Sequence, residues 1–278
     1  MTKMRLDLLL FERGLFESRA RASAAVIAGD VLLLPGRDRA LKPGQMVASD
    51  VDVEVAATLP YVSRGGVKLA NALDGFGIDV TGAQALDVGA STGGFTDCLL
   101  QRGAAHVVAL DVAYGELSWK LREDQRVTVL ERRNARALTG AELPYAPTVI
   151  VIDVSFISLT KVLPAVVACA AAARFDCLAM IKPQFEVGRE RIGKGGVVRT
   201  ALDRRSALSS VGQFALADLG VSVCGYASSG LPGPKGNRET FIWLAEPGRS
   251  GALDGSEAVE LAALAAEPDE VADGRATP

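Results

Sequence analysis

The sequence of 278 residues is poor in the side chains on which several enzyme classes depend. Its single histidine, His106, begins an apolar run at the end that faces away from the expected site, so we interpret it as structural. Triad chemistry based on histidine is therefore poorly supported. The four cysteines are widely spaced and include no Cys-x-x-Cys pair, which argues against a disulfide framework and against a metal site.

Long hydrophobic segments are also missing. No run approaches the roughly 18 apolar residues that a membrane span needs, and the longest candidate, residues 162–173, contains Pro164 and is mostly alanine. Acidic residues precede any long apolar stretch at the N-terminus, which argues against a secretory signal. We therefore expect a cytoplasmic protein with no membrane partner, whose 49% hydrophobic content supplies a real core.

Charge is unevenly distributed along the chain. The net charge is −3, but residues 247–278 carry seven acids and two arginines, which leaves the remainder at +2. That last stretch has few large apolar groups, so it predicts an acidic, disordered tail with at most one short helix near residues 256–265. A nucleic-acid partner is compatible with the rest of the chain.

Two domains are expected, joined by a linker at residues 58–62. Residues 1–57 read as a small α+β unit with helices at 5–14 and 18–29 and strands at 31–34 and 51–55. Arginines in the first turn of the second helix oppose the helix dipole, which favours a role in binding phosphate over a role in stability. A solvated helix face explains them equally well. The candidate RNA contacts in this unit are Arg5, Arg13, Arg19, Arg21 and Lys42.

Residues 63–246 alternate apolar runs with helical patterns, which is typical of a mostly parallel α/β sheet. Strands at 221–226 and 239–244 are joined by a short loop that makes the last strand antiparallel. The sequence predicts helices over residues 67–73, 94–101, 116–122, 159–173 and 202–219.

A glycine-rich turn at residues 87–95 follows one of the apolar runs. Ser91 stands where a dinucleotide-binding Gly-x-Gly-x-x-Gly motif has its second glycine, so a pyrophosphate is a poor fit and S-adenosyl-L-methionine a better one. Asp111 ends the next strand and is suited to bind ribose hydroxyls. The alternative is a turn that is glycine-rich only for packing. The candidate cofactor residues are Asp87, Gly89, Ser91, Gly93, Gly94, Phe95, Asp111 and Asp153.

Two further apolar runs end at Asp153 and Lys182, and parallel strands bring such ends to one edge of the sheet. A lysine among carboxylates is able to orient a hydroxyl group and remove its proton, although a plain ion pair is the simpler explanation. Amine- and base-methylating enzymes carry two prolines within the segment that here reads Asp153-Val154-Ser155-Phe156. Their absence favours an oxygen acceptor, and methylation of an RNA amine or base remains the alternative.

Five segments together resemble the TlyA, or hemolysin A, family. They are residues 63–68, 87–95, 153–159, 182–188 and 231–237. The resemblance implies an N-terminal RNA-binding domain of ribosomal-protein type and an FtsJ-like, Rossmann-like class I methyltransferase domain that uses S-adenosyl-L-methionine. It also implies methylation of cytidine 2′-hydroxyls in ribosomal RNA, with ribosomal RNA or ribosomal subunits as partners and no metal.

The same resemblance implies a catalytic tetrad of Lys68, Asp153, Lys182 and Glu239, with Lys182 handling the proton. In the linker this chain has Leu59-Pro60-Tyr61-Val62, where mycobacterial members have Arg-x-Trp-Val. The family name also raises a membrane-active hemolysin as an alternative, and an RNA-binding protein without activity is another.

Basic residues also occur outside the N-terminal unit. Glycines and cations alternate over residues 188–196, directly after Lys182, which predicts a loop that orders on the RNA backbone, and a plain surface loop is the alternative. The candidate RNA contacts in the larger domain are Arg64, Arg189, Arg191 and Lys194.

Overall fold

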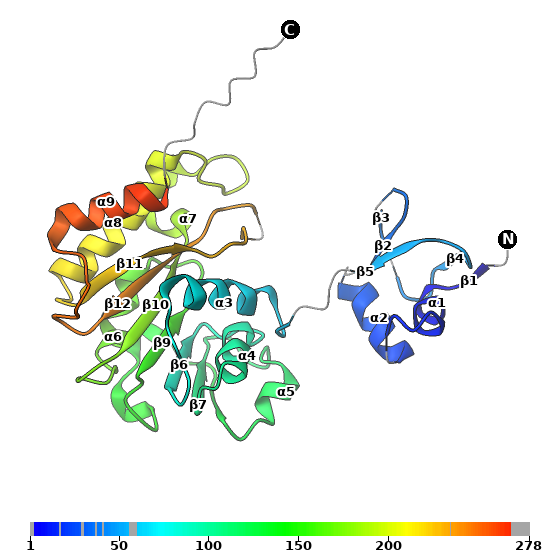
Figure 1. Ribbon diagram of the computed structural model, residues 1–278, viewed down its shortest axis with the longest axis horizontal. Helices are drawn as coiled ribbons and strands as arrows, with labels where there is room; N and C mark the ends of the chain where they lie inside the picture. Colours follow the sequence, from blue (N-terminus) through cyan, green and yellow to red (C-terminus); the bar gives the residue numbers. More distant parts are fainter. Residues whose placement is uncertain are drawn as a thin grey trace, which may run out of the picture. The chain divides into compact units, whose positions relative to one another are not determined.

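The computed structural model describes residues 3–16, 18–28, 31–36, 38–40, 42–55, 60–233 and 235–267. The chain divides into two compact units, Met1–Pro60 and Tyr61–Pro278 (Figure 1). Tyr61 and Val62, expected in the linker, pack on the larger unit, where the Val62 amide donates to the Asp97 carboxylate over 2.9 Å. Leu59, the other end of the altered linker segment, lies outside the described residues.

The smaller unit is a small α+β fold, as the sequence predicts. Its helices are α1 (Leu6–Glu12) and α2 (Arg19–Ala28), and its strands are β1 (Lys3–Arg5), β2 (Val31–Leu33), β3 (Asp38–Arg39), β4 (Met46–Ala48) and β5 (Val53–Val55). β1 pairs with β4, and β2 pairs with β3 and β5, all antiparallel. Leu6, Leu9 and Leu10 of α1 form the core with Val26 and Val31, which matches the helical spacing of these leucines in the sequence.

The larger unit is built on a seven-stranded sheet with the order β11-β12-β10-β9-β6-β7-β8. The strands are β6 (Gln84–Val88), β7 (His106–Leu110), β8 (Val127–Leu130), β9 (Val149–Ile152), β10 (Asp176–Ile181), β11 (Ser222–Ser228) and β12 (Thr240–Ala245). β6 to β10 pair in parallel, and β12 runs antiparallel to both β10 and β11. The mostly parallel sheet with an antiparallel last strand is therefore confirmed.

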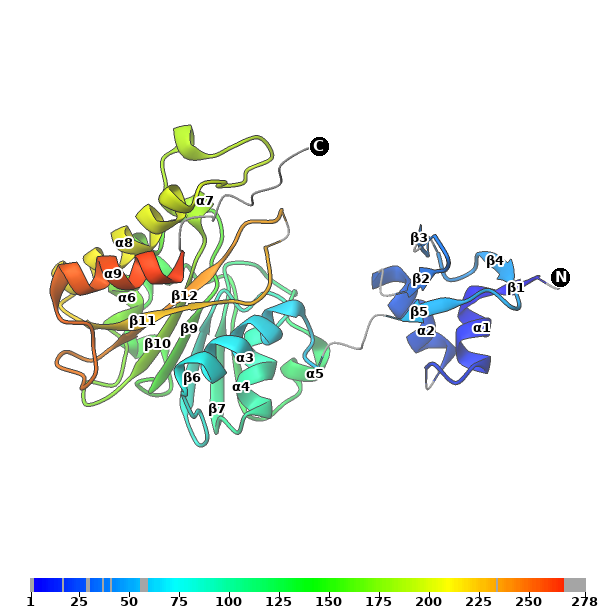
Figure 2. The same ribbon diagram turned by 45° about the horizontal axis from the view of Figure 1, so that its top comes forward.

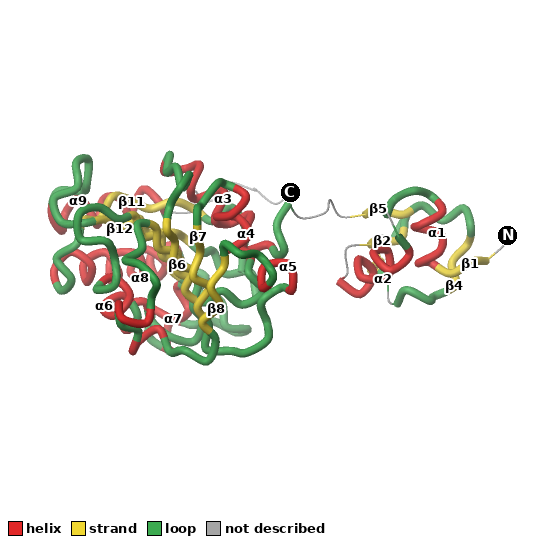
Figure 3. Tube along the Cα trace, turned by 90° about the horizontal axis from the view of Figure 1, so that it is seen from below, coloured by secondary structure: helices red, strands yellow, loops and turns green. Residues whose placement is uncertain are grey.

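Helices cover both faces of this sheet (Figure 2). They are α3 (Arg64–Phe76), α4 (Gly94–Gln101), α5 (Trp119–Arg122), α6 (Leu163–Val167), α7 (Pro183–Glu186), α8 (Ala201–Ala217) and α9 (Gly255–Ala266). Side chains of α3, α4 and α5 share one buried cluster with the strands, and side chains of α6, α8 and α9 share the other. Figure 3 shows the strands between these two groups of helices.

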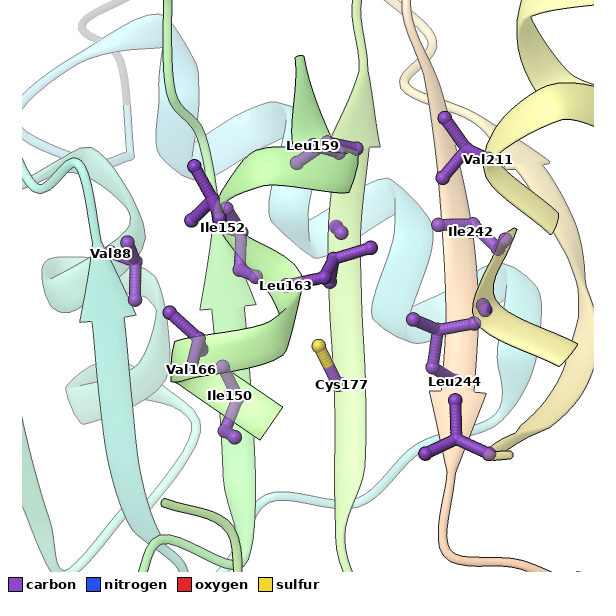
Figure 4. Close-up of a cluster of buried hydrophobic side chains, with 14 of the residues drawn as sticks. Val88, Ile150, Ile152, Leu159, Leu163, Val166, Cys177, Val211, Ile242 and Leu244 are labelled. Carbon is purple, nitrogen blue, oxygen red and sulfur yellow. The ribbon is translucent and has the colours of Figure 1, made fainter. Parts of the chain in front are cut away.

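Neighbouring residues of the central strands point into opposite clusters. In β6, Ala85 belongs to the cluster under α3 and α4, whereas Leu86 and Val88 belong to the cluster under α6 and α8. Figure 4 shows the latter cluster, with Leu163 and Val166 lying over the strands. A strand buried on both faces reads as a continuous apolar run, which is how these strands appear in the sequence.

The helix predicted over residues 159–173 is shorter and broken. A 3-10 turn at Leu159–Lys161 precedes α6, which ends at Val167. Pro164 lacks an amide hydrogen, so a helix that begins at residue 159 is unable to continue through it. Beyond α6, the Ala171 amide bonds to the carbonyl of Pro147 over 2.9 Å, which takes the chain out of the helical path.

The disordered tail predicted from residue 247 is wrong as far as residue 267. The short helix is present as α9, but it packs against α8 and β11 and buries Val259 and Ala263. A Cβ on Gly212 of α8 would collide with Val259, so the two helices approach closely because residue 212 is glycine. Small residues make this contact, which is why a search for large apolar groups misses it. Residues 268–278 lie outside the described residues.

Candidate active site

A cavity of about 480 Å³ opens at the carboxyl ends of β6, β7 and β9. We call it the donor cavity. Its wall includes Gly89, Ser91, Asp111 and Asp153, four of the residues predicted to bind a cofactor. It also includes Asn134, which sequence reasoning missed because no strand end or glycine motif marks it.

The turn after β6 is held in an unusual backbone conformation. Gly89 has φ +86° and Ser91 has φ +47°. A Cβ on residue 89 would overlap the carbonyl oxygen of Asp153, so glycine is required there. The Ser91 amide donates to Asp111 Oδ2 over 2.7 Å, and the Ala113 amide donates to Asp111 Oδ1 over 2.8 Å. These bonds fix the Asp111 carboxylate at the cavity wall and leave lone pairs on both oxygens for a ligand.

Asp87 lies in the interior and does not reach the donor cavity. It is fully buried, and its Oδ2 accepts a 2.6 Å hydrogen bond from the Thr96 hydroxyl. Burial, helped by the nearby charge of Asp153 and opposed by the Thr96 bond, raises the pKa of Asp87 to about 7. Asp87 therefore makes no direct contact with the donor cavity, and it is able to affect a ligand only through its charge or by positioning the turn after β6.

Gly93, Gly94 and Phe95 also occupy packing positions and are absent from the cavity wall. Gly93, the residue before α4, has φ +95°, and a Cβ there would collide with Leu121. A Cβ on Gly94 would overlap the Ser63 hydroxyl, and the Phe95 ring packs on a second phenylalanine ring in the core. The two halves of the glycine motif thus differ: Gly89 and Ser91 line the donor cavity, whereas residues 93–95 pack against neighbouring elements.

A second cavity of about 490 Å³, which we call the acceptor cavity, shares Asp153, Ser155 and Phe156 with the first. All four residues of the predicted tetrad line it: Lys68, Asp153, Lys182 and Glu239. They come from α3, from the ends of β9 and β10, and from the residue before β12. The predicted donor and acceptor sites therefore open on the same edge of the sheet.

The tetrad forms two ion pairs. Lys182 Nζ lies 2.5 Å from Asp153 Oδ1 and donates to the Ser155 hydroxyl over 2.9 Å. Lys68 Nζ pairs with Glu239 Oε2, and these two side chains are only 10% and 2% exposed. The Lys182 side chain is 11% exposed. Both amines therefore lie in positions largely shielded from water, where charge interactions are strong.

Phe156 is the most unusual side chain of the site. It is 92% exposed and has φ +66°, a region that a bulky residue rarely adopts. Its ring lies 5.3 Å from that of Phe185, which also lines the acceptor cavity. An exposed ring on a strained backbone at a cavity rim indicates a contact surface for a ligand. Sequence reasoning used Phe156 only as part of a motif.

Glu186 joins the two segments that carry the site. Its carboxylate accepts from the Ser158 hydroxyl over 2.6 Å and from the Leu159 amide over 2.9 Å. Burial raises the pKa of this carboxyl group. The segment after Lys182 is thereby fastened to the segment after Asp153.

Three of the five predicted RNA contacts of the smaller unit, Arg5, Arg13 and Arg19, have partners within the protein. Arg5 donates to Asp7 over 2.8 and 3.1 Å, and Arg19 lies 3.2 Å from the same carboxylate. Arg13 donates to the carbonyls of residues 49 and 51. Lys42 is exposed. For Arg21 only the backbone, in α2, is described.

In the larger unit, Arg64 donates to the carbonyl of Pro232 over 2.9 Å, at the loop before β12. Arg189, Arg191 and Lys194 are exposed on the loop that follows α7, and Arg191 donates to the Ser206 hydroxyl over 3.0 Å. This loop contains a 3-10 turn at Arg189–Arg191 and a bridge between residues 193 and 197. Its Ile192 and Gly196 line the acceptor cavity, whereas the three basic residues do not, so the loop reaches the cavity through its apolar and glycine positions.

Comparison with known proteins decides the family. The FtsJ-like methyltransferase family matches residues 61–246. The chain belongs to this family. Over 246 residues it is 47% identical to the 16S/23S rRNA (cytidine-2′-O)-methyltransferase TlyA of Mycobacterium tuberculosis, covering 87% of this chain and 90% of that protein.

Two further similar proteins carry the hemolysin name. The chain is 39% identical to hemolysin A of Brachyspira hyodysenteriae over 85% of this chain and 97% of that protein. It is 39% identical to a Streptococcus thermophilus protein provisionally described as a hemolysin, whose solved structure superposes with a TM-score of 0.72 over 96% of each chain. The resemblance inferred from the motifs is therefore confirmed, and the protein is a methyltransferase of this family.

Among the described residues, no helix combines the length and apolar character needed to cross a bilayer.

Proposed function

We propose that this protein transfers a methyl group from S-adenosyl-L-methionine to cytidine 2′-hydroxyls of ribosomal RNA, in the small subunit, the large subunit or both. The observation that carries the proposal is the wall shared by the two cavities, where Asp153 faces the donor side and pairs with Lys182 on the acceptor side. Relatives that are 47% and 34% identical are named rRNA (cytidine-2′-O)-methyltransferases, which supports the choice of substrate.

The donor cavity suits this cofactor. Its volume of about 480 Å³ falls within the range of small-molecule sites. Asp111 offers oriented acceptors for ribose hydroxyls, and Gly89 lets a ligand approach the backbone closely. The wall carries three carboxylates, those of Asp111, Glu116 and Asp153, against one guanidinium, that of Arg133, and this excess of negative charge attracts a cationic ligand. When bound, S-adenosyl-L-methionine supplies an electrophilic methyl group on a sulfonium centre.

The tetrad supplies the groups that a hydroxyl acceptor needs. An acceptor in the second cavity would meet Lys182 Nζ, which Asp153 and Ser155 hold from two sides. Lys182 Nζ would orient the hydroxyl group and handle its proton beside the Asp153 carboxylate. The Lys68–Glu239 pair, buried on the other side of the cavity, would orient the ribose.

Phe156 supports an RNA substrate over a small alcohol. Single-stranded RNA is commonly recognised by stacking its unpaired bases on aromatic side chains. The exposed Phe156 ring stands at the rim that both cavities share, and the ring of Phe185 lies beside it. A target nucleotide stacked on Phe156 would bring its ribose next to the tetrad.

Methyl incorporation tests the proposal. Purified protein is incubated with ribosomal RNA or subunits and labelled cofactor, and the product is mapped by its resistance to alkaline cleavage. We expect Lys182→Ala to abolish labelling and Lys161→Ala, which removes an exposed lysine, to leave it unchanged. A labelled product that remains sensitive to alkali would indicate amine or base methylation. Full labelling by Lys182→Ala would refute the mechanism.

A further inference from the structure

The C-terminal helix α9 lies beyond the residues that the FtsJ-like family matches, which end at residue 246. It is nevertheless packed into the larger unit, and it ends at an acidic residue, Glu267, whose side chain is 6% exposed. A buried carboxylate at the end of a helix is costly unless cations compensate it. Two arginines contact this carboxylate, and each is connected to a segment that lines the acceptor cavity.

The first of these contacts comes from α8. Arg204 Nε donates to Glu267 Oε2 over 2.8 Å, and the Arg204 side chain is only 4% exposed. The same guanidinium donates through Nη1 to the carbonyl of Arg199 over 2.7 Å. Arg199 directly follows the segment 192–198, which carries Ile192 and Gly196 of the acceptor cavity wall. Through Arg204, Glu267 therefore helps to hold the backbone at Arg199, directly after the segment that lines the cavity.

The second contact comes from the segment before β12. Arg238 Nη1 lies 3.6 Å from Glu267 Oε2, and Arg238 stands between Asn237 and Glu239 in the chain. Asn237 and Glu239 both line the acceptor cavity. The buried Asn237 side chain also joins the two segments, because it accepts from the Val198 amide and donates to the Gly196 carbonyl, each over 2.9 Å.

We propose that Glu267 is a positioning residue for the acceptor side of the site. One carboxylate oxygen contacts Arg204, which bonds to the carbonyl that follows segment 192–198, and Arg238, which stands next to Glu239 in the segment before β12. None of Glu267, Arg204 and Arg238 lines the donor cavity. Glu267 thus fixes where the RNA ribose is held, and it leaves the binding of cofactor unchanged. The inference rests on the proposed RNA substrate.

Steady-state kinetics with RNA and direct binding of S-adenosyl-L-methionine test the proposal. The proteins compared are wild type, Glu267→Ala, Glu267→Gln and, as control, Glu260→Ala, which removes an exposed glutamate of the same helix. For Glu267→Ala we expect kcat/KM for RNA to fall by about 10- to 100-fold, because displacements near 1 Å have effects of that size. Glu267→Gln, which keeps the shape of the side chain, should fall less. The cofactor Kd should change by less than about twofold, as for independent sites.

A second variant covers the case in which Glu267→Ala does not fold. Arg238 is 61% exposed, so Arg238→Ala should fold normally and still raise the KM for RNA. Combined with Glu267→Gln, it should add little further loss if both residues act through one contact. Additive losses would mean that Arg238 touches RNA directly, which would refute its part in this arrangement.

The results that overturn the proposal are specific. A purely structural role predicts fewer cofactor sites per chain and a lower kcat per total protein, with an unchanged KM for RNA and equal loss in all Glu267 variants. A parallel rise in the cofactor Kd would also refute it. Failure of the wild-type protein to methylate RNA would instead refute the proposed function, and with it this inference, before any variant is compared.

Discussion

The buried pair of Lys68 and Glu239 permits a sharp test of how the site is held together. Their side chains are 10% and 2% exposed, so replacing Lys68 by methionine leaves the Glu239 carboxylate shielded from water without its ammonium partner. Breaking a buried pair in this way costs about 3–5 kcal/mol of unfolding free energy. For a unit of this size that corresponds to a melting temperature lower by roughly 6–20 °C.

The double variant Lys68→Met/Glu239→Gln separates stability from activity. It buries no net charge, so we expect it to recover more than half of the lost stability. It still lacks the groups proposed to orient the ribose, so it should remain as inactive as the single variant. Thermal unfolding and methyl incorporation are measured on the same four proteins: wild type, the two variants, and Lys161→Met as an exposed control.

Two results would refute this reasoning. A Lys68→Met protein as stable as wild type would mean that Glu239 is not held as a buried charge. A double variant no more stable than the single one would mean that lost packing, and not the lone carboxylate, determines the cost.

Three further predictions follow from the backbone and from pKa shifts. Gly89→Ala should raise the cofactor Kd at least tenfold in a binding assay, because its Cβ would displace the Asp153 carbonyl; an unchanged Kd would contradict the tight turn. The arginine partners of Asp7 lower its pKa to about 2. The ionised carboxylate therefore stabilises the smaller unit above about pH 4, and this stability is lost as pH falls toward about 2. Acid titration should show this loss, about 1–2 kcal/mol given the exposed arginines, in wild type and not in Asp7→Asn. The pKa of Asp87 is raised to about 7, so the sign is opposite: stability that is fully present below about pH 4 is lost progressively as pH rises toward about 7. Without cofactor, the melting temperature of Asp87→Asn should therefore rise relative to wild type between about pH 4 and about pH 8, and a difference that does not change with pH would contradict this.

Much of the fold was predictable because its central strands are buried on both faces. Such strands read as continuous apolar runs, and their parallel order fixes that the residues ending them share one edge of the sheet. Lys182 and Asp153 end neighbouring strands, so their pairing follows from local sequence and from sheet geometry alone. No tertiary detail was needed to expect these two side chains to meet.

Lys68 and Glu239 are different, because 171 residues separate them in the chain. Neither residue carries a local mark of its role: a lysine in a helix and a glutamate before a strand are usually exposed. Only the family resemblance pointed to them, and only the packing of α3 beside β12 buries them together. The glycine motif also serves packing, since a Cβ on Gly93 or Gly94 would collide with neighbouring atoms and neither residue lines the donor cavity. Their part in binding the cofactor stays a prediction.

The sequence by itself therefore determined the sheet, its direction and the strand-end residues, because periodicity and chain order act over a few residues. The tertiary structure alone decided which distant charges are buried, that Phe156 stands exposed on a strained backbone, and that residues 255–266 form a packed helix. Composition predicted a disordered tail because α9 offers few large apolar groups. Its packing comes instead from Val259, fitted against Gly212 of α8, and from the buried Ala263, contacts that exist only once both helices are in place.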